Sequence, residues 1–264
     1  MISYKTFKHV ELMAESGKIL AGIIKEMIAA AQPGVTTQEL DDLARRLCRE
    51  SNVKPAFLDY PVMGKKFPAV ACLSVNDAIV HAIPTERKLQ EGDVLGIDMG
   101  VVYRGWNSDS AVTVLVGSDQ WLVDSALPTT HYALPQKLIA VTRESMYLGI
   151  AQAKPGNHVG DISHAVQTYV ESPGFGVVRD LVGHGIGREL HEEPRVPNFG
   201  KPGEGPELKE GMVICIEPMV TAGDWRLVLD DDGFTYRTKD GSLGAHFEHT
   251  VAITKEGPQI LTAL

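Results

Sequence analysis

The first part of the chain shows the hydrophobic spacing of two amphipathic helices. Between Thr6 and Ala31 apolar side chains recur every third or fourth position, as in a helix with one buried face. Pro33-Gly34 interrupts that pattern. Thr36 and Glu39 then have the spacing of a capping box, which predicts a second helix that runs to about Glu50.

Shorter apolar runs follow, and they favour strands. Residues 55–68 have the character of a loop, whereas Val70 to Ile83 and Val94 to Val116 are rich in β-branched residues. Arg104-Gly105 predicts a hairpin turn inside the second run. Residues 117–137 have no clear periodicity, so we interpret them as a connector.

The second half repeats the plan of the first. Helices are expected at about Leu138 to Ala153 and Val159 to Glu171, and strands continue through Ile253. Helices that alternate with antiparallel hairpins predict an α+β fold in which the helices cover one face of a curved sheet.

One short template is written twice in the chain. Residues 89–98 read LQEGDVLGID and residues 208–217 read LKEGMVICIE, so each copy has a Glu-Gly turn, an apolar strand and a final acid. A second acid follows in each half, and a Pro-Gly loop precedes the second helix of each half. One such similarity is weak evidence for a duplication, because these turns are common. Three similarities in the same order predict a single domain with pseudo-symmetric halves of about 1–116 and 138–264.

Composition and charge narrow the classes of function. The 264 residues are 44% hydrophobic and 22% charged, which is typical of a globular domain that buries most of its surface. A net charge of −9 without basic clusters argues against sequence-independent binding to nucleic acid or to anionic membranes. The N-terminal residues lack a signal-peptide pattern, and Lys25 and Glu26 interrupt the apolar stretch around them. We therefore expect a cytoplasmic protein without a membrane span.

The three cysteines, Cys48, Cys72 and Cys215, are an odd number without CxxC spacing. This argues against a disulfide framework and against a thiolate metal site. A cysteine nucleophile is a less favoured interpretation than a small buried hydrophobic residue.

The four acids that follow the apolar strands predict a metal centre. Carboxylates gathered at the ends of buried strands repel one another and lose hydration, so about two divalent cations would be needed to neutralise them. His184, within the glycine-rich run GHGIG, is the candidate imidazole ligand. A lone histidine is more often structural, but the duplicated carboxylates favour the ligand interpretation.

A set of motifs spans nearly the whole chain in order. The set comprises VNDAIVHAIP with His81, GIDMG with Asp98, NSDSAV with Asp109, GHGIGRELHEEP with His184 and His191, CIEPMV with Glu217, and FEHT with Glu248. It resembles the type I methionine aminopeptidases of peptidase family M24. The resemblance implies the pita-bread fold, in which helices and an antiparallel curved β-sheet are duplicated about a pseudo-two-fold axis. It also implies removal of the N-terminal methionine from nascent proteins and peptides, where the second residue is small, by water activated at a dinuclear metal centre.

The same resemblance assigns roles to individual residues. Asp98 would bind one metal ion, His184 and Glu217 the other, and Asp109 and Glu248 both. The ions would be Co, Mn, Fe or Zn, which carboxylate-rich sites with one imidazole accept.

The remaining roles concern catalysis and the substrate. His81 and His191 would contact the substrate outside the ligand set, and Glu217 would shuttle protons. Phe67, Cys72 and Phe234 would line the pocket for the methionine side chain.

Two rival functions stay open at the level of sequence. Another pita-bread metallopeptidase, such as an Xaa-Pro aminopeptidase or a prolidase, would keep the same ligands. Those enzymes usually have a large preceding domain, and we expect none here because Asp98 lies fewer than 100 residues from Met1. A non-catalytic binding protein of the same fold is disfavoured, since such proteins typically lose ligands. The expected partners are nascent N-termini, at the ribosome exit, for a monomeric enzyme.

Overall fold

The structure is a computed structural model that describes residues 1–118 and 133–264. Its elements are α1 (Phe7–Ala30), α2 (Thr37–Glu50), β1 (Lys54–Pro55), β2 (Pro61–Val62), β3 (Lys65–Lys66), β4 (Cys72–Val75), β5 (Ala78–Val80), β6 (Val94–Tyr103), β7 (Trp106–Leu115), α3 (Ala133–Gln152), α4 (Val159–Glu171), β8 (Gly176–Val177), β9 (Gly183–Gly185), β10 (Glu192–Val196), β11 (Val213–Ile216), β12 (Met219–Thr221), β13 (Leu227–Leu229), β14 (Tyr236–Thr238), β15 (Gly244–His246), β16 (Glu248–Thr254) and β17 (Gly257–Ile260).

The longest strand pair, β6 and β7, forms the hairpin that the sequence predicted. The strands pair without a register shift from Val94 with Leu115 to Tyr103 with Trp106. Arg104 and Gly105 connect them with φ angles of 50° and 78°. A two-residue turn with both φ angles positive matches the natural twist of the strands, so this tight turn fixes the register of the whole hairpin.

The central sheet joins strands from the two ends of the chain. Its nine strands follow the order β1-β6-β7-β16-β11-β9-β10, with β4 beside β6 and β17 beside β16. The seam is the antiparallel pairing of β7 with β16, where Ala111 lies opposite Glu248 and Ser110 opposite His249. Because β6 and β11 flank this seam, all the strands that precede or carry the predicted acids are neighbours.

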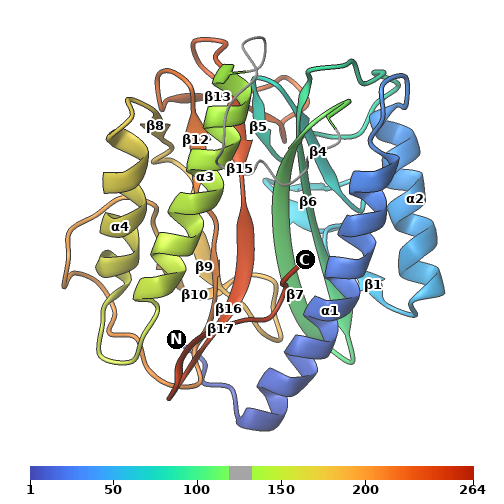
Figure 1. Ribbon diagram of the computed structural model, residues 1–264. Helices are drawn as coiled ribbons and strands as arrows, with labels where there is room; N and C mark the ends of the chain where they lie inside the picture. Colours follow the sequence, from blue (N-terminus) through green and yellow to red (C-terminus); the bar gives the residue numbers. More distant parts are fainter. Residues whose placement is uncertain (119–132) are drawn as a thin grey trace.

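The helices pack beside the sheet in two pairs. In Figure 1 α1 and α2 lie beside the strands of the first half, and α3 and α4 beside those of the second. The buried face of α1, including Leu20, Ile24 and Met27, joins a core cluster with strand residues such as Ile97. This arrangement confirms the predicted α+β fold with duplicated helices and a curved antiparallel sheet.

Most helix ends lie within one or two residues of the predicted boundaries. The capping box of α2 forms as expected, because Oε2 of Glu39 accepts from the backbone N–H of Thr36 at 2.7 Å. The predicted start of the third helix is wrong: residues 133–137, assigned to the connector, belong to α3. Pro135 lies in the first turn described for that helix, where no intrahelical bond from its nitrogen is needed. The rest of the connector, residues 119–132, lies outside the described residues.

Two smaller corrections concern the segment before β6. The loop expected at residues 55–68 contains the short hairpin of β2 and β3. The run from Val70 to Ile83 is divided into β4 and β5 at Asn76, which has a φ of 61°. None of the described helices is long and apolar enough to cross a membrane.

Candidate metal centre

Three carboxylates converge around Ala111 in the middle of the sheet. Ala111 on β7 pairs with Asp98 on β6 and with Glu248 on β16, so both acids lie in the same row across the sheet. Asp109 lies two residues before Ala111 and therefore projects from the same face. Carboxylate oxygens of Asp98, Asp109 and Glu248 all lie within 4.8 Å of one another.

An imidazole and a fourth carboxylate complete the group. Nε2 of His184, from β9, lies 3.5 Å from Oε1 of Glu217, the residue that follows β11. The other ring nitrogen, Nδ1, lies 2.9 Å from the carbonyl oxygen of Gly185. If Nδ1–H donates to this carbonyl, Nε2 keeps its lone pair, which is the form that ligates a metal.

Glycines on both sides of His184 permit its close packing. A Cβ on Gly183 would lie 2.4 Å from the carbonyl oxygen of Cys215, and a Cβ on Gly185 would lie 2.2 Å from that of Glu193. Larger residues at either position would push β9 away from its neighbours. The imidazole of His184 would then move away from the carboxylates of the site.

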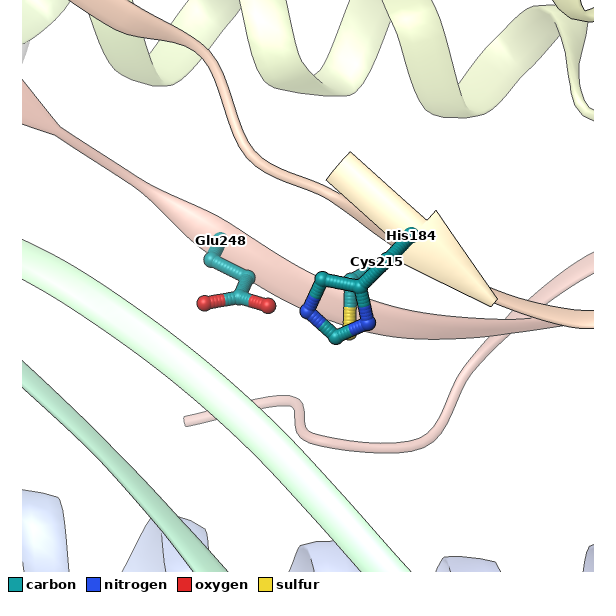
Figure 2. Close-up of side chains that lie close together, drawn as sticks. All are labelled: His184, Cys215 and Glu248. Atoms are coloured by element: carbon teal, nitrogen blue, oxygen red, sulfur yellow. The ribbon is translucent and has the colours of Figure 1, made fainter. Parts of the chain in front are cut away.

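Cys215 also lies in this neighbourhood. Figure 2 shows it beside the ring of His184, and ligand atoms of Cys215, His184 and Glu248 lie within 4.8 Å of one another. Burial and the charge of Glu248 raise the pKa of the Cys215 thiol well above its usual value. A neutral thiol is a poor metal ligand, and Sγ lies 3.7 Å from Oγ1 of Thr250. We therefore pair His184 with Glu217 and leave Cys215 outside the ligand set.

Among the described residues, no lysine or arginine compensates the charge of the acids of this centre. Burial, followed by the charge of Asp109, raises the pKa of Asp98 well above its usual value, and burial raises that of Asp109 to about 7. Burial and neighbouring acids also raise the pKa of Glu217 and Glu248 well above their usual values. Across residues 1–118 and 133–264, no lysine or arginine forms an ion pair with any of them.

Unsatisfied hydrogen-bond acceptors also indicate that this group of acids requires cations. Oδ1 of Asp98, Oδ1 of Asp109 and Oε1 of Glu248 are buried without a hydrogen-bond partner in the part of the chain that the structure describes. Buried acceptors without partners are costly in a folded protein unless something else satisfies them. Oxygen atoms beside one available imidazole nitrogen form a donor set that suits divalent cations. The residues present therefore fit a metal centre.

Three further histidines surround this group. His81 follows β5 with a φ of 58°, and its exposed side chain lines the pocket. The ring of His191 lies 4.3 Å from that of His184, measured between centroids, and its Nδ1 lies 2.6 Å from the hydroxyl of Tyr60. His246 is buried, its Nε2 has no hydrogen-bond partner among residues 1–118 and 133–264, and burial lowers its pKa to about 3.

An apolar compartment adjoins the charged group. The rings of Phe67 and Phe234 meet edge to face, with centroids 5.6 Å apart and an interplanar angle of 78°. Cys72 is buried in the same cluster, and burial raises the pKa of its thiol well above the usual value. These residues and the carboxylates line one pocket of about 210 Å³.

The structure brings every predicted site residue to this pocket. The pocket wall includes His81, Asp98, Asp109, His184, His191, Glu217 and Glu248 together with Phe67, Cys72 and Phe234. The sequence interpretation missed two polar residues, Tyr60 and His246, that line the same pocket. His246 had a signal, since it precedes Glu248 by two residues and strand residues at that spacing share a face. Tyr60 lies in an irregular segment and had no such signal.

Comparison with known proteins shows the same fold and family. Residues 11–255 match the model of metallopeptidase family M24. A methionine aminopeptidase of Clostridium acetobutylicum is 44% identical over 263 residues, which cover 99% of each chain. The crystal structure of methionine aminopeptidase from Thermotoga maritima superposes with a TM-score of 0.90 at 44% identity and covers 100% of both chains.

A more distant likeness bears on the rival function. Prolidase from Pyrococcus furiosus superposes with a TM-score of 0.76, at 23% identity, over 99% of this chain and 65% of that one. At this identity the likeness shows the shared fold alone. The full-length matches at higher identity decide the family: the chain belongs to metallopeptidase family M24, among its methionine aminopeptidases.

Proposed function

We propose that this protein removes the N-terminal methionine from proteins and peptides whose second residue is small. We further propose that the ten predicted pocket residues bind the metal ions, bind the substrate and transfer the protons. The single observation behind the assignment of residues is the meeting of two environments in one pocket. Carboxylates without protein counter-charge lie beside an apolar compartment with two aromatic rings. The first environment suits cations that activate a hydrolytic reaction, and the second suits the side chain of methionine.

The proposed metal ligands are Asp98, Asp109, His184, Glu217 and Glu248. Two divalent ions, drawn from Mn, Fe, Co or Zn, would fit a donor set of four carboxylates and one imidazole, of which Asp98, Asp109 and Glu248 have ligand atoms within 4.8 Å of one another. When bound, such ions supply Lewis acidity toward a substrate carbonyl and make a water molecule more acidic. His184 offers its Nε2, and the acids offer the oxygens that have no other partner.

The residues around these ligands would carry out the proton transfers. Glu217 would accept the proton of the attacking water and deliver it to the departing amine, since its side chain lies at the pocket wall and burial makes its ionised carboxylate a stronger base. His191, fixed by the hydroxyl of Tyr60, would donate a hydrogen bond to the developing oxyanion. His81, whose side chain lines the pocket, would stand beside the scissile amide.

The apolar compartment would determine the choice of the first residue. The thioether of methionine is polarisable and packs favourably at the edges of aromatic rings. Phe67 and Phe234 present such edges, and the neutral thiol of Cys72 adds no charge. Charged and polar first residues would lose hydration there without gaining partners.

The expected setting of this reaction follows from the proposed substrate. We propose a cytoplasmic, monomeric enzyme that meets nascent chains at the ribosome exit. The test of function is release of methionine from Met-Ala-Ser by purified protein loaded with Mn or Co, compared with cleavage of Ala-Pro peptides. We expect fast release from Met-Ala-Ser that a chelator abolishes. Faster cleavage of the proline peptide would favour the prolidase-like alternative, and no hydrolysis of either would favour a binding protein.

A further inference from the structure

A buried lysine near the start of the chain reaches the segment that carries His191. Tyr4 and Thr6 are exposed, but Lys5 between them is only 7% exposed. Lysines are almost never buried without a partner. The partner here is Glu192, whose Oε2 lies 2.8 Å from Nζ of Lys5. The two side chains are 3% and 13% exposed, so water screens this ion pair little.

Ser3 extends the contact into a small network. Its Oγ accepts a hydrogen bond from Nζ of Lys5 at 2.6 Å and donates one to Oε2 of Glu192. The backbone N–H of Lys5 donates to the carbonyl oxygen of Gly211 at 2.7 Å, just before β11. Residues 3–5 are therefore tied both to the central sheet and to Glu192, and we call this segment the N-terminal latch.

The carboxylate of Glu192 also binds the backbone of the segment that precedes His191. Oε1 of Glu192 accepts from the backbone N–H of Glu189 at 3.2 Å, so both its oxygens are used. Gly187 gives the lysine its path, because a Cβ there would lie 2.6 Å from Cε of Lys5. The backbone of residues 187–192 is thus held between the latch and its own hydrogen bonds.

His191 directly precedes Glu192, and its ring enters the pocket between Tyr60 and His184. Tyr60 fixes the ring through Nδ1 but cannot fix the backbone that carries it. A shift of one ångström in a group that contacts a reacting atom can lower a rate by as much as about a hundredfold. We propose that Lys5 is a positioning residue that acts through Glu192 to hold His191 in the pocket. This inference rests on the proposed function, because it assigns a partner to His191.

The decisive experiment is a double-mutant cycle between Lys5 and His191. Lys5→Met is expected to lower kcat for Met-Ala-Ser about tenfold and to leave KM within about twofold, since the apolar compartment is not touched. In the His191→Ala background the same change should alter kcat by less than about twofold, because the residue through which Lys5 acts is gone. Metal content, measured by elemental analysis, should equal that of the unmodified protein in every variant.

Controls separate this role from a general loss of structure. Lys8→Met removes the same charge from an exposed neighbour and should leave kcat unchanged. Lys5→Arg keeps a donor for Glu192 and should restore part of kcat. If Lys5→Met does not fold, Glu192→Gln removes the other charge of the same ion pair. Its loss of kcat should likewise depend on the presence of His191.

Three other results would count against the proposed role of Lys5 or against the proposed function. A Lys5→Met protein with the kcat of Lys8→Met overturns the inference. Equal losses of kcat in the presence and absence of His191 also overturn it, because they assign the effect to another part of the site. If the unmodified, metal-loaded protein itself releases no methionine, the proposed function fails first.

Discussion

Nε2 of His246 lies 3.8 Å from Oε2 of Glu217, while the other oxygen of that carboxylate faces Nε2 of His184 at 3.5 Å. The carboxylate of Glu217 therefore lies between two imidazoles. Nε2 of His246 is buried and has no other partner, so a small movement of Glu217 would bring the two into hydrogen-bonding distance. In that position His246 would orient the proposed proton shuttle.

This relationship predicts a difference between two substitutions of His246. His246→Leu should lower kcat about tenfold, because the carboxylate loses its donor. His246→Gln should retain most of kcat, since an amide can donate from a similar position. Initial rates on Met-Ala-Ser would show the difference, and equal rates for the two variants would remove His246 from the reaction.

Loss of a proposed ligand should be far more severe. His184→Ala removes the nitrogen donor and should lower both turnover and bound metal, and Glu217→Gln removes a ligand and a proton carrier. Turnover should fall by about a hundredfold or more in each. Steady-state kinetics and elemental analysis on the same preparations would test this. Near-normal turnover in either variant would contradict the assignment of ligands.

His81 should behave differently from the ligands. His81→Ala should keep the full metal content but lose rate, because its ring lines the pocket without belonging to the carboxylate groups. The measurement is elemental analysis beside kcat. Metal loss in this variant would show that His81 supports the cations instead.

The aromatic compartment can be tested through substrate binding. Phe234→Ala removes the edge-to-face contact with Phe67 and opens the wall of the pocket. KM for Met-Ala-Ser should rise about tenfold, with a smaller effect on kcat. Val228→Ala, at an exposed position on β13, is the matched control and should leave KM unchanged. An equal KM in both variants would place the methionine side chain elsewhere.

The metal-free protein should lose stability as the pH rises, and Asp109 predicts the range. Its pKa is raised by burial from 3.8 to about 7. Because the folded state holds this proton more tightly than the unfolded state does, the stabilisation is complete below about pH 4 and is lost as the pH approaches 7.

The variant Asp109→Asn removes this contribution, since the amide does not titrate, and it also removes the charge that raises the pKa of Asp98, Glu217 and Glu248. In denaturant unfolding without metal, the free energy of unfolding of the unmodified protein should fall relative to Asp109→Asn between pH 4 and pH 7. Saturating Mn should abolish that fall, because a cation stabilises the ionised carboxylate. A difference that is constant with pH would show that Asp109 ionises normally in the fold.

Much of this centre could be predicted because its residues lie in regular elements. The positions of Asp98 and Asp109 follow from one hairpin. The duplicated template correctly predicted a strand before Glu217 as before Asp98, although β6 continues past Asp98 whereas β11 ends before Glu217. The hairpin turn and the capping box of α2 depend on local backbone chemistry, which short sequences specify well. The division into two halves stays a prediction.

The missed features depend on contacts between distant residues. The contact of Tyr60 with His191 joins residues 131 positions apart, and that of Lys5 with Glu192 joins residues 187 apart. Neither pair has a spacing that a local pattern can show. The start of α3 was misplaced because Pro135 was taken as a mark of irregular structure, although proline is well tolerated in a first helical turn.

The pairing of β7 with β16 has a consequence for the integrity of the centre. Ala111 lies between Asp98 on β6 and Glu248 on β16, two positions that are 150 residues apart in the sequence. A chain that ended after β7 would keep Asp98 and Asp109 but lose the third carboxylate. Only the docking of β16 against β7 completes the group, so the centre depends on a contact that the whole chain must fold to make.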